Sequence, residues 1–149
     1  MGYVQKEIAE DHQRVRFECM SHRRPALLAG RKGIGKSADE YLESGQSKLD
    51  NGDFYGAIDD WNKAIDINPQ YADAYVNRGY AKEKLGDHQG AIANYTKAIQ
   101  IDPQDALAYI KRGYEKGLSG DLQGMCLDLR KGSSLGNKTP TKFLKKYCQ

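Results

Sequence analysis

The chain has 149 residues, the size of one ordinary domain, of which 39% are hydrophobic and 29% charged. No apolar run approaches the roughly 18 residues that a membrane span needs, or the core of a signal peptide, so we expect neither membrane insertion nor export. The net charge of +3 is unevenly distributed, because residues 37–104 carry 12 acidic and 6 basic groups whereas both ends are basic.

The three cysteines, Cys19, Cys126 and Cys148, are odd in number and widely scattered. This pattern is not that of a disulfide framework and is typical of a reducing compartment. We therefore expect a cytoplasmic protein.

Residues 1–36 form an N-terminal basic extension. Apolar residues fall near helical spacing at Val4, Ile8, Val15 and Cys19, which predicts a helix over residues 4–20. We interpret the segment from Arg23 to Lys36 as a linker.

Residues 30–37 match the phosphate-loop pattern GxxxxGK[ST], whose backbone N–H groups and lysine bind nucleotide phosphates. Such a loop works between a buried strand and a helix, and needs an acidic residue at another strand end to hold magnesium. No strand periodicity is present in the sequence, so we interpret the segment as a basic linker in which Ser37 caps the following helix. Cys19 and His22 have half the spacing of a metal site, but no second pair follows, and no metal or cofactor is expected.

The rest of the chain is built on an internal repeat. Residues 38–71 and 72–105 are identical at 16 of 34 positions without a gap, and a third copy, residues 106–138, matches the second at 11 of its first 19 positions. Apolar residues recur at helical spacing in each copy. A repeat of this period predicts two amphipathic helices per copy that stack on their neighbours.

The same residues mark the predicted helix ends in each copy. A Gly-Asp pair separates the two helices at Gly52–Asp53, Gly86–Asp87 and Gly120–Asp121. Glycine can adopt the left-handed conformation that closes a helix, and aspartate caps the next one. Proline disfavours helical angles in the residue before it, so the second helices should end at Asn68–Pro69 and Asp102–Pro103.

This repeat resembles the tetratricopeptide repeat (TPR) family, whose unit has an aromatic residue at position 4, Gly at 8, Ala at 20, an aromatic residue at 24, Ala at 27 and Pro at 32. The first copy has Tyr41, Gly45, Ala57, Trp61, Ala64 and Pro69 there, and the second has Tyr75, Gly79, Ala91, Tyr95, Ala98 and Pro103. The third keeps Tyr109 and Gly113 but has Met125, Leu129, Gly132 and Asn137 at the other positions. The resemblance implies an all-α fold over residues 37–149, a right-handed superhelix of helix-turn-helix repeats.

A C-terminal capping helix is expected over residues 139–148. Thr139 would be its N-cap and Pro140 its first residue, with one apolar face formed by Phe143, Leu144 and Tyr147.

In TPR proteins the first helix of each repeat lines a concave groove in which ligands bind. We predict a partner-binding groove formed by Leu42, Gln46, Asp73, Val76, Asn77, Tyr80, Ile110, Lys111 and Tyr114. Leu42, Val76 and Ile110 would form an exposed apolar ladder, the two tyrosines would act as interface anchors, and Asn77 could pair with the backbone of an extended peptide.

One specific mechanism of the family is not expected. Chaperone-binding members hold a C-terminal carboxylate with Lys at position 5 and Asn at 9 of one repeat, Asn at 6 of the next, and Lys at 2 and Arg at 6 of the third. Leu42, Gln46 and Leu107 stand at three of these positions here. Asn77 and Lys111 alone do not make that clamp.

We expect a non-enzymatic protein-interaction module or assembly scaffold that binds a protein or peptide of unknown identity in the groove. Two alternatives stay open. The basic ends could bind nucleic acid or an anionic membrane surface, although they lack interleaved aromatic residues, or residues 30–37 could bind a nucleotide. Three arrangements stay open for the N-terminal segment: it could dock on the first repeat, associate with a second copy of itself, or be mobile.

Overall fold

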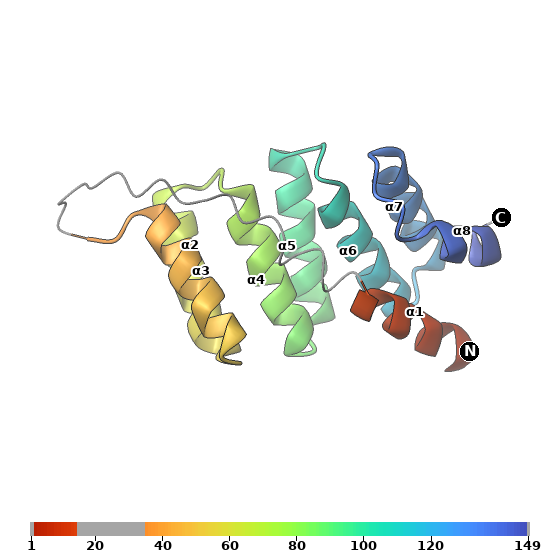
Figure 1. Ribbon diagram of the computed structural model, residues 1–149, viewed down its shortest axis with the longest axis horizontal. Helices are drawn as coiled ribbons and strands as arrows, with labels where there is room; N and C mark the ends of the chain where they lie inside the picture. The colour runs from red at the N-terminus through yellow and green to blue at the C-terminus, as the bar shows by residue number, and fades with distance from the viewer. Residues whose placement is uncertain (1, 15–34, 149) are drawn as a thin grey trace.

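The computed structural model describes residues 2–14 and 35–148, and Figure 1 shows their helices. In chain order these are α1 (Gly2–Arg14), α2 (Ala38–Asp50), α3 (Phe54–Ile67), α4 (Ala72–Lys84), α5 (His88–Ile101), α6 (Ala106–Leu118), α7 (Leu122–Ser134) and α8 (Thr141–Tyr147). The described part of the chain is entirely α-helical, as expected. The predictions for residues 15–34, including Cys19, His22 and most of the phosphate-loop-like motif, lie outside it.

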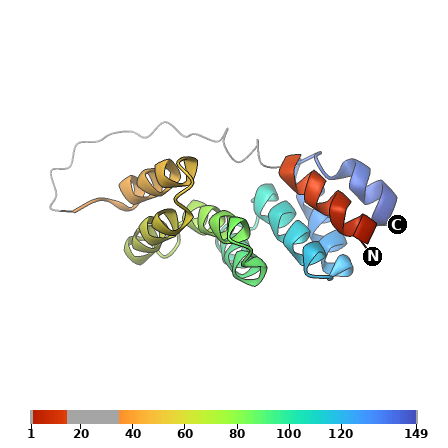
Figure 2. The same ribbon diagram turned by 90° about the horizontal axis from the view of Figure 1, so that it is seen from below.

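Helices α2 to α7 form three helix pairs in a row, which pack within each pair and against the next pair (Figures 1 and 2). The expected turn residues close each pair. Gly52, Gly86 and Gly120 all have positive φ, between 77° and 91°, which glycine adopts without strain. The aspartate after each of them accepts a hydrogen bond from the N–H of the glycine three residues on, at 2.8–2.9 Å.

The other predicted helix ends are also confirmed. Ser37 is the N-cap of α2 and forms a capping box with Glu40, in which each side chain accepts a hydrogen bond from the backbone N–H of the other residue. α3 and α5 end directly before Asn68 and Asp102, the two residues that precede proline.

Small residues bring the two helices of a pair into close contact. In the first pair the Trp61 side chain is fully buried, and a Cβ added at Gly45 would lie 2.4 Å from its indole nitrogen. The same nitrogen donates a 3.2 Å hydrogen bond to the carbonyl oxygen of Leu42. Glycine at position 8 therefore makes room for the large aromatic side chain at position 24.

A polar contact recurs between positions 7 and 23 of the repeat. Ser44 donates to Asp60 at 2.7 Å, Arg78 donates to Asn94 at 2.7 Å, and Arg112 donates to both oxygens of Asp128 at 2.7 and 2.8 Å. The two arginines also reach back to the preceding pair, to Asn62 and Thr96 respectively. These contacts satisfy polar groups that lie inside the stack.

The C-terminal helix α8 covers the third pair with its apolar face. Phe143 is buried beside Tyr114, and Leu144 and Tyr147 pack against the same cluster, as expected. The helix begins at Thr141, with Pro140 in the cap position and no side-chain capping bond. The prediction of a Thr139 cap is therefore wrong, because that residue lies in the preceding turn, where its N–H donates to the side chain of Asn137.

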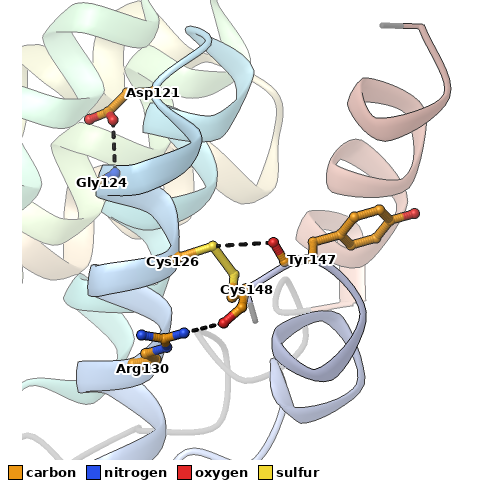
Figure 3. Close-up of a disulfide and its surroundings, with 6 residues drawn as sticks. All are labelled: Asp121, Gly124, Cys126, Arg130, Tyr147 and Cys148. Carbon is orange, nitrogen blue, oxygen red and sulfur yellow. Dashed lines mark hydrogen bonds between the residues drawn. A yellow bond between two sulfur atoms is a disulfide. The ribbon is translucent and has the colours of Figure 1, made fainter.

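The expectation that the cysteines form no disulfide is also wrong. Cys126 of α7 and Cys148, directly after α8, are disulfide-bonded, with their Cα atoms 5.5 Å apart (Figure 3). Arg130 adds a hydrogen bond to the carbonyl oxygen of Cys148. Sequence spacing could not show this pairing, because the two residues are 22 positions apart and meet only when α8 folds back on α7.

Candidate partner-binding groove

The predicted groove residues belong to the first helices of the three pairs, α2, α4 and α6. Direct contacts link these helices. The Tyr71 hydroxyl, at the start of α4, donates to Asp39 of α2, and the Lys111 ammonium of α6 lies 3.6 Å from the Glu83 carboxylate of α4. The groove residues therefore lie on neighbouring elements, as the repeat predicts.

The apolar ladder is not the exposed row that the sequence predicts. Leu42 is half-buried against the cluster around Trp61, whereas Val76 is 5% exposed and Ile110 fully buried. Ile110 also fits against Gly132, where an added Cβ would lie 2.5 Å from an Ile110 side-chain carbon. The ladder residues thus contribute mainly to the stability of the stack.

Tyr80 and Lys111 form a buried polar cluster between the second and third pairs. The Lys111 ammonium lies 4.7 Å from the centre of the Tyr80 ring, and the Lys84 ammonium lies 5.1 Å from it. Lys111 is one of the two residues that match the carboxylate clamp, but it is 1% exposed and faces Glu83. Its ammonium is therefore buried beside Glu83 and is not presented to the open groove.

The first two pairs present the open part of the groove. Asp73 is exposed, and Gln46 and Asn77 are half-exposed, with the Gln46 amide donating to Asp50 on its own helix. The exposed carboxylates Asp39 and Glu43 lie on the same helices.

Carboxylates lie around the Tyr71 hydroxyl in the open part of the groove. Burial raises the pKa of Tyr71 well above its usual value, and the hydrogen bond to Asp39 and the charges of Asp39, Asp73 and Glu43 raise it further. Burial likewise raises the pKa of Asp105, against the hydrogen bonds from the backbone N–H groups of Ala108 and Leu107, and the charges of Asp102 and Asp73 add to the rise. The described side chains of the open groove therefore include three exposed carboxylates, Asp39, Glu43 and Asp73.

The third pair is occupied by the chain's own N-terminal helix. α1 packs against α6, and its Ile8 is fully buried in one cluster with Ile110, Tyr114 and Met125. The Gln5 amide donates to the carbonyl oxygen of Gly117 at 3.2 Å. Figure 2 shows α1 beside α6 and α8, at the opposite end of the row from α2. Among the arrangements left open for this segment, docking on the first repeat is wrong, because the described helix docks on the third.

A polar contact fixes the other side of α1. The Lys146 ammonium of α8 lies 2.9 and 3.0 Å from the two oxygens of Glu7, and the Tyr147 hydroxyl also donates to this carboxylate. These hydrogen bonds, that from Tyr147 first, hold the pKa of Glu7 below its usual value. Sequence reasoning missed these residues, although the spacing of Val4 and Ile8 correctly indicated a helix with an apolar side.

Comparisons with known proteins identify the family of the repeat. A sequence profile described as "TPR repeat" matches residues 45–86, and one described as "Tetratricopeptide repeat" matches residues 72–105. The chain is a tetratricopeptide repeat protein. TPR domains are generally protein-interaction modules rather than enzymes. No curated protein sequence matches the chain significantly.

Solved structures share the fold. The first TPR of Spaghetti (RPAP3), bound to the HSP90 peptide SRMEEVD, is 24% identical with a TM-score of 0.71, over 75% of this chain and 90% of that chain. The Arabidopsis OM64 TPR domain is 26% identical with a TM-score of 0.70, over 74% and 93%. MamA is 29% identical with a TM-score of 0.65, over 73% and 61%. In the described part of our chain, no helix is long and apolar enough to cross a bilayer.

Proposed function

We propose that this TPR protein is a non-enzymatic interaction module that binds a segment of a partner protein in its concave groove. The observation that carries this proposal is α1, because a helical segment from a distant part of the chain already lies on one of the groove helices. Its contacts combine a buried aliphatic side chain with polar bonds at the edge, as interfaces between separate proteins do.

The charge of the open groove selects against the peptides bound by the RPAP3 domains. Those peptides, SRMEEVD and SGPTIEEVD, end in acidic residues. The open groove here presents Asp39, Glu43 and Asp73, and Lys111, which stands at the arginine position of the clamp, faces Glu83. A partner segment that carries basic residues over the first two repeats is complementary to this surface.

The expectation of a cytoplasmic protein depended on unpaired cysteines, and the disulfide between Cys126 and Cys148 removes that argument.

The proposal is tested by matched charge reversals on neighbouring helices. Partners are captured with the wild-type chain, identified, purified and titrated against the Asp73→Lys variant, in which the change lies in the open groove. The Asp66→Lys variant is the control, since Asp66 is an exposed aspartate of α3, a second helix that does not line the groove. We expect Asp73→Lys to weaken binding at least tenfold and the control to bind like wild type. Equal affinity of all three chains would overturn the proposal.

A further inference from the structure

The surface of the third pair on which α1 lies, formed by Ile110, Tyr114, Gly117 and Met125 and called the seat below, is adapted to a helix. The groove position held by Leu49 in the first copy and Glu83 in the second is Gly117 in the third. A Cβ added at Gly117 would lie 2.5 Å from the Met125 sulfur of α7 and 3.2 Å from the terminal carbon of Ile8, and the Gly117 carbonyl oxygen accepts the hydrogen bond from Gln5. Glycine at this one copy of the position therefore makes room both for Met125 and for the close approach of α1 to the α6 backbone.

The seat also has a defined chemical pattern. Ile8 enters the apolar cluster, Val4 packs against it one turn earlier, and Glu7 meets the Lys146 and Tyr147 side chains of α8. A helix that fits therefore has two aliphatic residues four positions apart and a carboxylate directly before the second one.

The interface is small enough to be exchanged. α1 has 13 residues, and an isolated helix of that length is marginal in water, so its helical state depends on docking. Residues 15–34 join α1 covalently to the first pair, so α1 docks as part of the same molecule and has a higher effective concentration than a separate helix. A separate helix must outcompete that concentration to enter the seat.

We propose that the seat on the third repeat recognises an amphipathic helix of the α1 pattern on a partner protein, and that α1 is the internal competitor that partner binding displaces. This inference rests on the proposed function and names the chemistry of the partner and the regulation of its access. α1 then keeps the apolar seat covered until such a helix is present.

The test uses the full chain and a fluorescent peptide of residues 2–14 as the probe helix. Ile8→Asp in the full chain places a charge in the apolar cluster and releases α1, while the seat itself is unchanged. Ala9→Asp introduces the same charge at the next, exposed position of the helix and is the matched control. Fluorescence of Trp61, which lies in the first pair, verifies that the repeats stay folded.

We expect the peptide to bind the Ile8→Asp chain at least tenfold more tightly than the wild-type or Ala9→Asp chain. A peptide that carries Ile8→Asp itself should not bind. Glu7→Gln in the full chain removes only the charged contact to α8, and should raise peptide affinity by a smaller factor without touching the apolar cluster.

Equal affinity of the peptide for the wild-type and Ile8→Asp chains would overturn the proposal. It would also be overturned if the wild-type chain formed dimers that Ile8→Asp abolishes, because the occupant of the seat would then be the α1 of a second copy. Neither result depends on Asp73, so failure here is distinguishable from failure of the groove proposal.

Discussion

Replacing Cys148 with serine is expected to detach α8 while the repeats remain folded. The disulfide joins residues 22 positions apart, and the chain-entropy model assigns about 3 kcal/mol to a loop of that length. α8 has seven residues, well below the ~12–15 that an isolated helix needs, so it depends on this bond and on burial of Phe143. Because stacked repeats contact only their neighbours, the loss should stay at the third pair and at α1, which contacts α8 through Glu7.

Hydrogen exchange measures this loss directly. A change of about 3 kcal/mol corresponds to roughly hundredfold faster exchange, which we expect for the amides of residues 138–148 in Cys148→Ser and in the reduced wild type. The urea midpoint reported by Trp61 fluorescence should change little. Cys19→Ser, which leaves both paired cysteines in place, is the control. The reasoning is refuted if the oxidised wild type has three free thiols or if α8 exchanges equally in the presence and absence of reductant.

Three further predictions concern the repeats. Gly45→Ala should lower the free energy of unfolding by about 1–3 kcal/mol in urea titrations, because its methyl group would meet the Trp61 indole; an unchanged midpoint would contradict this contact. Asp128→Asn should cost about 3 kcal/mol in the same assay, because it leaves two cationic partners without their buried counter-ion, and a loss under 0.5 kcal/mol would disprove it. Burial opposes ionisation of Asp60, but the hydrogen bonds that its carboxylate accepts, first that from Lys48, outweigh burial and lower the Asp60 pKa. The free energy of unfolding should therefore fall as the pH drops from about 3.9, the pKa of an aspartate in the unfolded chain, through the lower pKa of the folded protein. Asp60→Asn should make this fall smaller.

The array was predictable from sequence because its determinants are local and repeated three times. The Gly-Asp turns, the position-8 glycines and the prolines each act within one helix pair, so their pattern indicates both the helices and their packing. A second glycine follows each turn glycine after four residues, at Gly56, Gly90 and Gly124. The sequence shows that this glycine recurs but gives no physical reason for it. The structure supplies a reason at Gly56, where an added Cβ would lie 2.1 Å from the capping carboxylate of Asp53.

The groove was less predictable because its final surface depends on contacts between distant segments. The sequence assigns Ile110 and Tyr114 to the groove surface, and they are buried here in a cluster shared with α1 and α8. Gly117, which makes room for Met125 and Ile8, is one glycine among 16 and carries little weight in a sequence. The disulfide could not be predicted for the same reason, because its two cysteines come together only when α8 packs against α7.

Site-directed photo-crosslinking tests the central claim, that partners bind in the groove, most directly. A photoreactive amino acid is placed at Asp73 in the open groove or at Gln100, an exposed position of the second helix α5. The account predicts that the purified partner crosslinks from position 73 and not from position 100, and that the crosslinked partner segment carries basic residues. Crosslinking from position 100 alone, or equally from both positions, would contradict it.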